Sequence, residues 1–125
     1  MSSNDSISII NDNDVRCPYS NPLADQLSGG NLQKFIVGRS LKAHPKVLII
    51  SQPTWGVDIG AANEIRSKLL LLAKARKAII LISQDLDEIY EISNNICVIN
   101  NGSLSTPKKT SKISATDIGI LMGIN

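Results

Sequence analysis

Two short apolar runs, VLII at residues 47–50 and AIILI at residues 78–82, constrain the fold more than any other feature of this sequence. Both runs are continuous rather than alternating, and Pro45 and Pro53 stand on either side of the first. Continuous runs of this length are typical of strands that are buried on both faces of a parallel sheet. The sequence therefore predicts two buried strands, at 46–51 and 78–83.

Helical periodicity separates these runs. Residues 29–43 contain no proline, and Ser28 stands where an N-cap residue belongs. Apolar residues recur at positions 61, 65, 69 and 72, and acids at 85, 87 and 88 open a further helix. Asn101 and Gly102 between 96–100 and 103–105 indicate a hairpin. The predicted fold class is α/β, with parallel strands, flanking helices and a C-terminal hairpin.

The number of strands limits how much the chain can bury. In 125 residues there are only two or three candidate core strands, and a parallel sheet that small buries little surface when both faces need covering. The chain is therefore predicted to be the C-terminal part of a larger domain. We expect a polar lead-in with at most one short element at 1–26, the partial domain at 27–106, and a polar linker with a short terminal helix at 107–125.

Composition excludes several classes of function. A net charge of +2 is too small to indicate nucleic-acid binding. The longest apolar runs fall short of the about 18–20 residues that span a bilayer, and the start MSSNDSISII does not resemble a secretory signal. Cys17 and Cys97 form neither a disulfide framework nor a metal-ligand pattern, and Cys97 is expected in the core. Trp55 is interpreted as a partner anchor or as a half-buried packing residue.

The segment LSGGNLQK at residues 27–34 carries the candidate chemistry. Ser28, Gly29 and Gly30 at a helix start leave backbone N–H groups without an intrahelical partner and without a side chain in front of them. Together with the helix dipole and the Ser28 hydroxyl, these donors form an anion site. The same turn is also compatible with a flexible helix cap.

The following segments favour the anion site. LSGG resembles the signature motif of ABC transporter ATP-binding subunits, and VLIIS-QPT (47–54), GVD (56–58) and LISQDL (81–86) resemble their Walker B strand, D-loop and switch region. QPTWGVDIGA, LDEI, the lead-in DVRCP (14–18) and the tail TDIGILM (116–122) are similar to the second ATPase half of sugar- and nucleoside-type importers. This resemblance covers roughly residues 12–124 and implies the C-terminal part of a P-loop NTPase domain.

Three positions depart from the family pattern. Ser51 replaces the Walker B aspartate, Gln52 the catalytic glutamate and Gln84 the switch histidine. A serine offers Mg²⁺ no carboxylate, and a neutral glutamine accepts no proton. No segment matches the P-loop pattern G-x-x-x-x-G-K followed by Ser or Thr. We therefore expect no ATP hydrolysis by this chain alone.

The resemblance implies a role in trans, on an ATP molecule held by the P-loop of another ATPase half. The residues implied in ATP contact are Ser28, Gly29, Gly30, Asn31 and Gln33, with Asp58 at the interface between the halves. Mg²⁺ is then held by the partner if at all. Further implied partners are membrane permease subunits, and the implied location is the cytoplasmic side of the cell membrane.

Two other hypotheses stay open. The chain is alternatively a truncated, inactive remnant or a structural assembly module that contacts no nucleotide. A third hypothesis, a self-sufficient nucleotide-hydrolysing enzyme, conflicts with the missing P-loop and with Ser51 and Gln52. None of these residues identifies the transported substrate.

Overall fold

The computed structural model describes residues 3–13, 15–16 and 29–123. The chain forms two compact units, an N-terminal unit (Met1–Ile82) and a C-terminal unit (Ser83–Asn125). No helix among the described residues is long and apolar enough to cross a membrane. These two units are defined by contacts within the chain, and they do not test the segment boundaries predicted at residues 26 and 106. Those boundaries stay a prediction.

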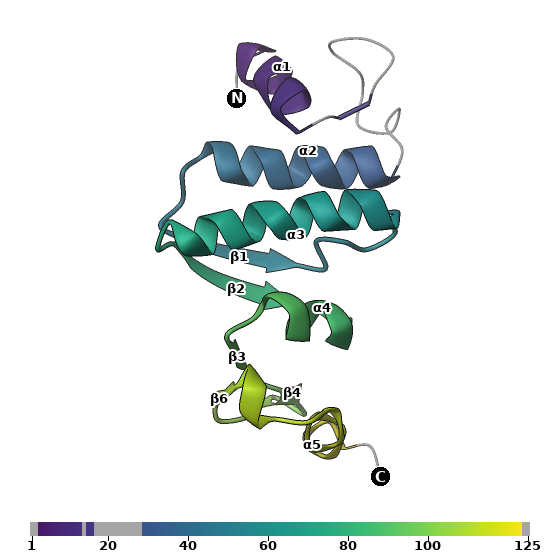
Figure 1. Ribbon diagram of the computed structural model, residues 1–125, viewed down its shortest axis with the longest axis vertical. Helices are drawn as coiled ribbons and strands as arrows, with labels where there is room; N and C mark the ends of the chain where they lie inside the picture. Colours follow the sequence, from purple (N-terminus) through teal and green to yellow (C-terminus); the bar gives the residue numbers. More distant parts are fainter. Residues whose placement is uncertain (1–2, 14, 17–28, 124–125) are drawn as a thin grey trace. The chain divides into compact units, whose positions relative to one another are not determined.

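The described residues of the N-terminal unit form three helices and one parallel strand pair (Figure 1). Strands β1 and β2 pair in parallel, in a register that runs from Val47 opposite Ala78 to Ser51 opposite Ile82. Helix α3 packs on β2, α2 packs on α3, and α1 packs on α2. The elements are α1 (Ser3–Asp12), α2 (Gly29–Lys42), β1 (Val47–Ser51), α3 (Ile59–Lys74) and β2 (Ala78–Ile82).

The predicted helices and strands of this unit are confirmed, and the boundaries predicted for 29–43, 46–51 and 78–83 differ from the observed ones by at most one residue. Burial of both strand faces is not confirmed. Leu48 and Ile50 are buried, whereas Val47 and Ile49 on the opposite face are exposed. Successive side chains of a strand point to opposite faces, so the described residues cover one face of this apolar pair and leave the other open.

Helix α1 exceeds the short element predicted for the lead-in. It runs for ten residues, and Ile9 is buried at 1% exposure. Polar contacts tie it to α2, because Lys42 Nζ donates a hydrogen bond to Ser8 Oγ at 3.0 Å and lies 3.9 Å from Asp5 Oδ1. Helix α1, in the described part of the lead-in, is therefore packed in the N-terminal unit.

The C-terminal unit consists of short elements around a small apolar core. Asn101 and Gly102 both have positive φ, 48° and 76°, as expected for a two-residue hairpin turn, and the predicted hairpin is confirmed. The core cluster consists of Ile96, Val98, Ile113 and Ile118. The elements are α4 (Leu86–Ile92), β3 (Asn95–Ile96), β4 (Ile99–Asn100), β5 (Ser103–Leu104), β6 (Lys108–Lys109), η2 (Thr110–Lys112) and α5 (Ala115–Leu121).

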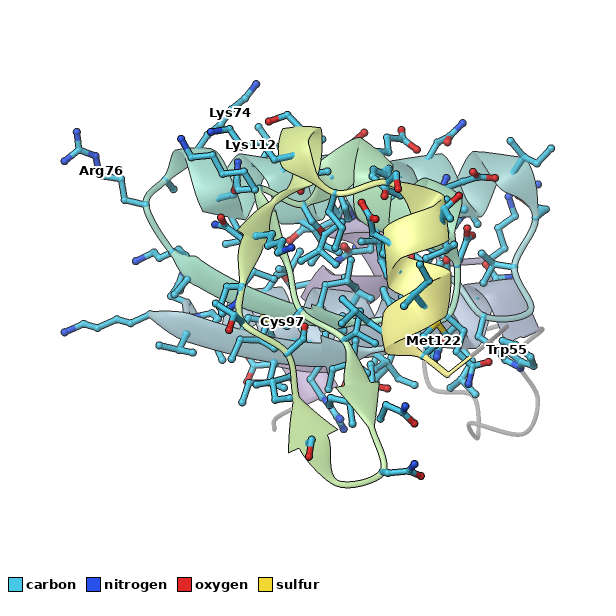
Figure 2. All side chains as sticks on the ribbon, turned by 90° about the horizontal axis from the view of Figure 1, so that it is seen from below. Trp55, Lys74, Arg76, Cys97, Lys112 and Met122 are labelled. Atoms are coloured by element: carbon cyan, nitrogen blue, oxygen red, sulfur yellow. The ribbon has the colours of Figure 1, made fainter. Side chains whose placement is uncertain are left out.

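Two features of the C-terminal unit differ from the prediction. The segment expected to be a polar linker contains β6 and η2, because β6 pairs antiparallel with β3 and Thr110 Oγ1 donates to the Ser93 carbonyl at 2.7 Å. Cys97 is exposed rather than part of the core (Figure 2). Cys97 lies between β3 and β4, and its neighbours Ile96 and Val98 are both buried, so its side chain points away from the core that they enter.

The predicted terminal helix is confirmed as α5, and a capping box fixes its start. Asp117 N donates to Ser114 Oγ at 3.1 Å, and Ser114 N donates to Asp117 Oδ2 at 3.0 Å. The hydrogen bond that the Ser114 backbone N–H donates to the Asp117 carboxylate, with a smaller contribution from the Ser114 side chain, holds the pKa of Asp117 below its ordinary value.

Candidate functional site

The signature segment is described from Gly29 onward, and Ser28 lies outside the described residues. Helix α2 begins at Gly29, and Gly30 and Asn31 follow in its first turn. That turn contains no acidic residue, whereas Arg39 and Lys42 lie in the last turn. The charge distribution along α2 therefore leaves the positive end of its dipole without a carboxylate of its own helix.

The structure brings two of the predicted site residues into direct contact. Gln33 Nε2 of α2 donates a hydrogen bond to the carbonyl of Gln52 at 3.2 Å. A second approach joins the same two regions, because a Cβ added to Gly29 would lie 3.6 Å from the Gly56 carbonyl oxygen. The signature helix is thus placed directly against the turn that follows β1.

The turn after β1 has a defined backbone. Gln52 and Gly56 have positive φ values of 49° and 70°. Gln52 N donates to the Ile82 carbonyl at 2.8 Å, and Trp55 N donates to the Gln52 carbonyl at 3.1 Å. These bonds hold Ser51 and Gln52 at the carboxyl end of the parallel pair, where ligands of parallel α/β sheets bind.

The turn after β1 exposes the aromatic side chain of Trp55 to solvent. Trp55 is 71% exposed, whereas Pro53 is fully buried. The interpretation of Trp55 as a half-buried packing residue is therefore wrong, and its role as a partner anchor stays a prediction. Figure 2 shows the Trp55 side chain projecting from the turn.

Asp58 is the N-cap of α3. Its Oδ1 accepts a hydrogen bond from Ala61 N at 2.8 Å, and its carbonyl accepts one from Ala62 N at 2.9 Å. The residue is exposed, so its carboxylate both caps the helix and faces solvent. The interface role predicted for Asp58 remains a prediction beside this structural one.

Replacing Asp58 by alanine is expected to lower the free energy of unfolding of the N-terminal unit by about 1 kcal/mol, because Ala61 N loses its acceptor. Asp58→Asn keeps an acceptor and is the matched control, with an expected loss near zero. Urea denaturation followed by circular dichroism measures both variants. Equal losses for the two would show that the charge, and not the cap, matters at this position.

Gln84 belongs to the C-terminal unit and lies between two residues that are held by hydrogen bonds. Ser83 Oγ donates to Glu88 Oε2 at 2.9 Å, and Asp85 N donates to Ser83 Oγ at 3.0 Å. Glu88 N in turn donates to Asp85 Oδ1 at 3.2 Å, which makes Asp85 the N-cap of α4. The backbone on both sides of Gln84 is therefore fixed.

Glu88 is the residue whose role was missed from the sequence. The sequence predicted for Glu88 only a place in the first turn of a helix, but the residue is only 1% exposed and its Oε2 accepts a hydrogen bond from Ser83 Oγ at 2.9 Å. The spacing of Asp85 and Glu88 resembles a capping box, but Asp85 N donates to Ser83 Oγ and the Glu88 carboxylate accepts from Ser83 Oγ instead, so this sequence pattern does not predict the role of Glu88.

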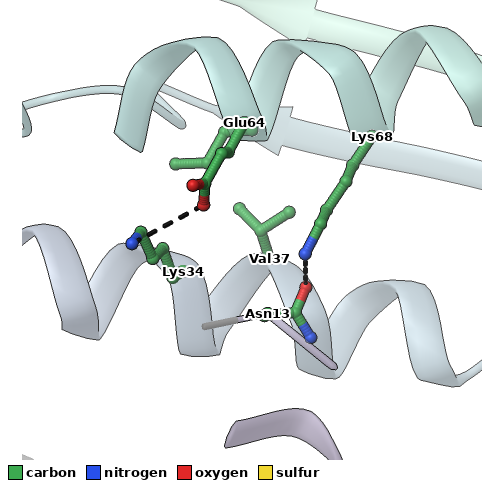
Figure 3. A pocket seen from close by; sticks show the side chains of 6 residues that line it. Asn13, Lys34, Val37, Glu64 and Lys68 are labelled. Atoms are coloured by element: carbon green, nitrogen blue, oxygen red, sulfur yellow. Dashed lines mark hydrogen bonds and ion pairs between the residues drawn. The ribbon is translucent and has the colours of Figure 1, made fainter. Parts of the chain in front are cut away.

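A narrow hollow lies between α2 and α3 (Figure 3). It is lined by Val37 and by two polar pairs: Lys34 Nζ lies 3.6 Å from Glu64 Oε2, and Lys68 Nζ bonds to Asn13 Oδ1. The hollow is too narrow to accept a ligand. The first pair joins α2 to α3 and the second joins α3 to Asn13. Both pairs therefore stabilise the packing around α2, the helix that begins in the signature segment. Among the residues that the structure describes, no three metal-ligating side chains of His, Cys, Asp or Glu lie together.

Comparison with known sequences finds relatives over most of the chain, although no protein-family model matches it. Guanosine import ATP-binding protein NupO of Bacillus subtilis is 39% identical over 115 residues, which are 92% of this chain and 22% of that protein. Nucleoside import ATP-binding protein NupA of Lactococcus lactis is 42% identical over 102 residues (79% and 20%). Galactose/methyl galactoside import ATP-binding protein MglA of Haemophilus influenzae is 38% identical over 110 residues (88% and 22%). The chain thus spans about a fifth of the length of these relatives.

Comparison with solved structures finds the same fold. The dimeric structure of a bacterial ABC transporter cassette matches with a TM-score of 0.74 and 20% identity, over 86% of this chain and 46% of that one. A metal-chelate type ABC transporter in an inward-facing conformation matches with a TM-score of 0.75 and 16% identity, over 96% and 48%. At these identities the likeness concerns the fold alone.

Proposed function

This chain is a homologue of one segment of the ATP-binding proteins of sugar and nucleoside importers and has the ABC ATPase fold, and from this relationship we propose that it is the C-terminal part of such a component. In this role it supplies the signature side of an ATP site whose P-loop belongs to a partner half. The observation that carries the proposal is the contact of the signature helix with the turn after β1, between Gln33 and Gln52.

The signature turn supplies hydrogen-bond donors in this role. Ser28 offers a hydroxyl, and Gly29 and Gly30 offer backbone N–H groups at a helix start, where an anion is favoured by the dipole. The absence of an acid in the first turn of α2 supports this role, because a carboxylate there would compete with a phosphate. When bound, the partner's ATP supplies the γ-phosphate that these donors contact.

In this proposal Gln33 is a positioning residue. Its side-chain amide donates a hydrogen bond to the Gln52 carbonyl, and this bond fixes the position of α2 relative to the end of β1. Asn31 Oδ1 accepts a hydrogen bond from Arg16 N at 2.8 Å and ties the lead-in to the same helix. Both side chains thereby keep the glycine turn in place.

In this proposal Mg²⁺ belongs to the partner. Ser51 at the end of β1 and Gln52 after it provide no carboxylate, and Mg²⁺ is usually held by one or two carboxylates and by phosphate oxygens. Mg²⁺ in a shared site is then held from the P-loop side. The remaining proposed partners are permease subunits of a sugar or nucleoside importer, on the cytoplasmic face of the membrane.

A second candidate function is an assembly module without nucleotide contact, or an inactive remnant. Ser51, Gln52 and Gln84 favour it, since none of the three carries a charge at neutral pH. Both candidates share the expectation that the chain alone releases no phosphate from MgATP.

The substitution Ser28→Arg tests the proposal. A long cation in the signature turn fills the space that a phosphate needs, so MgATP-dependent association with a P-loop-bearing ATPase half from a relative is expected to weaken by more than about tenfold, which corresponds to about 1.4 kcal/mol. Sedimentation velocity with and without MgATP measures the association.

Ser67→Arg is the matched control, because Ser67 is an exposed residue of α3 and a surface substitution there is expected to change association by less than about twofold. Association that depends on MgATP and is equal in the two variants contradicts a signature role. Association that is independent of MgATP in the unsubstituted chain favours the assembly module.

A further inference from the structure

The charges of the N-terminal unit are separated along the direction of its strands. Residues 35–57 and 65–82 contain no Asp or Glu, whereas three of the 13 Lys and Arg residues of the chain lie in the first range and five lie in the second. The acids nearest to these ranges, Asp58 and Glu64, stand before α3 and in its first half. The net charge of +2 therefore conceals a strongly positive end of this unit.

Two loops bring the cations together at the amino end of the strand pair. One loop joins α2 to β1 and the other joins α3 to β2 (Figure 1). Ala78 N donates a hydrogen bond to the Lys46 carbonyl at 3.0 Å, so the loops lie side by side where the strands begin. Each loop contains a residue with positive φ, as is typical where a helix ends. We call this part of the molecule the basic end, and its residues are Lys42, His44, Lys46, Lys74, Arg76 and Lys77.

The cations of the basic end are available to a partner. Lys42 lies 3.9 Å from Asp5 Oδ1, but the side chains of Lys46, Lys74 and Arg76 form no hydrogen bond or ion pair with the residues that the structure describes. All three residues are exposed, and Figure 2 shows Lys74 and Arg76 projecting from the ribbon. A helix dipole favours Lys42 and Lys74 in the last turns of α2 and α3. It does not account for Lys46 in front of β1, and like charges at this spacing repel one another until an anion binds.

An apolar groove adjoins the basic end. It lies between α1, α2 and α3 and has a volume of about 430 Å³, within the range of about 300–1,000 Å³ that is typical of binding pockets. His44 lines it, and Lys77 N donates to the carbonyl of Leu72 in its wall, so groove and basic end are continuous. The carboxylate of Asp12, also in the lining, accepts a hydrogen bond from Ser8 Oγ at 3.1 Å. The apolar lining residues are Ile9, Leu41, Leu71 and Leu72.

Cations beside an apolar groove restrict the chemistry of the partner. Cations alone would suit the phosphates of a nucleic acid, an anionic lipid surface or an acidic protein. A nucleic acid has no apolar side chains for the groove, and a bilayer keeps its hydrocarbon beneath the polar headgroups. An amphipathic helix with acids beside its apolar face supplies both groups, and such helices bind in grooves of this kind.

We propose that the basic end and the adjoining groove dock an acidic amphipathic helix of a partner protein. Its carboxylates contact Lys46, Lys74 and Arg76, and its apolar side chains enter the groove beside Leu71. The five residues of β1 separate this surface from the turn at Gln52 by about 16 Å, at about 3.3 Å per residue. Docking therefore requires no nucleotide and does not depend on the role proposed for the signature turn.

Reversing three charges of the basic end tests the proposal. The probe is a short fluorescein-labelled peptide in which pairs of glutamates alternate with pairs of leucines, and fluorescence anisotropy measures its binding to the 125-residue chain. In the triple variant Lys46→Glu, Lys74→Glu and Arg76→Glu, the dissociation constant is expected to rise by more than about tenfold, because three attractive contacts become repulsive.

The matched control reverses three lysines of the C-terminal unit, in the triple variant Lys108→Glu, Lys109→Glu and Lys112→Glu. These lysines are exposed, and both triple variants have the same net charge. The control is expected to bind the peptide within about twofold of the unsubstituted chain, since the effect of distant exposed charges is screened by salt. Circular dichroism reports the folding of each variant, and the exposure of the substituted side chains predicts unchanged spectra.

Leu71→Ser tests the groove separately from the charges. Leu71 is 64% exposed, and its loss is expected to weaken binding of the leucine peptide by about threefold or more, because apolar contact is lost. A peptide with serines in place of the leucines is expected to bind at least about tenfold more weakly and to bind Leu71→Ser and the unsubstituted chain equally.

Four results would overturn the proposal. The first is no binding of the leucine peptide to the unsubstituted chain. The second is equal weakening in the two triple variants, which would mean that net charge alone attracts the peptide. The third is equal binding of the leucine and serine peptides, which would exclude the groove. The fourth is tighter binding to phosphatidylglycerol vesicles or to duplex DNA than to the leucine peptide, which would assign the basic end to a lipid surface or to a nucleic acid. Loss of binding in the basic-end variant, with binding retained in the control and weakened without leucines, supports the proposal.

Discussion

Replacing Ile65 by alanine is expected to lower the free energy of unfolding of the N-terminal unit by about 2–5 kcal/mol. Ile65 is 2% exposed on α3, and it lines the narrow hollow between α2 and α3 together with Val37, which is 1% exposed. Removing three carbon atoms there leaves a cavity that the neighbouring helices only partly fill. A loss of this size is large compared with the about 5–15 kcal/mol of a typical domain.

Ile59→Ala provides the control on the same helix. Ile59 is 81% exposed at the start of α3, and the same loss of atoms is expected to change the free energy of unfolding by less than about 0.5 kcal/mol. Urea denaturation followed by circular dichroism measures both variants. Similar losses in the two variants would contradict the packing of α3 between the sheet and α2.

Replacing Gly38 by alanine is expected to destabilise the N-terminal unit by up to about 2 kcal/mol, although alanine is the better helix former. Helix propensity alone favours the alanine by about 1 kcal/mol. The added Cβ, however, would meet Asn13 Nδ2 too closely and would lie 2.6 Å from Asn13 Cγ and 2.9 Å from Ile9 Cγ2. Overpacking of this kind costs about 1–3 kcal/mol, and Asn13 cannot move away freely because it bonds to Lys68 and to the Ile9 carbonyl.

Gly119→Ala is the matched comparison, because Gly119 also lies inside a helix but a Cβ there meets nothing within 4 Å. The same substitution is expected to protect the amides of α5 by about 0.5–1 kcal/mol. Hydrogen exchange resolved by residue measures both sites, with faster exchange expected in α1 for Gly38→Ala. A stabilised α1 in that variant would show that α1 and α2 are not in close contact.

Much of the fold could be predicted from local patterns. The apolar spacing at Ile65 and Leu69 indicated α3, and the pair Asn101 and Gly102 indicated the hairpin. Both signals act over a few residues, so the chain carries them without its tertiary context. The two-residue strands β3 and β6 have no such pattern. They pair across a long separation because Ile96 and Ile113 enter the same core.

The candidate site was only partly predictable. The segment LSGG marked the signature turn, but the bond from Gln33 to the Gln52 carbonyl depends on how α2 packs beside β1. The apolar runs correctly indicated strands. One face of the β1–β2 pair is nevertheless open, because a strand pattern shows which side chains can be buried and not which neighbouring elements are present. The prediction that Cys97 lies in the core was wrong for a related reason. Only the alternation of buried and exposed residues around Cys97 decides which side it faces.

The position of Trp55 gives this chain an optical property. It is the only tryptophan in the sequence, it is 71% exposed, and it stands next to Gly56, which approaches Gly29 of the signature turn. Its indole fluorescence therefore comes from a single place on the molecule and from a water-exposed environment. Emission moves to shorter wavelength when water leaves such a ring, so the unlabelled protein reports by colour whether anything covers the turn beside its signature helix.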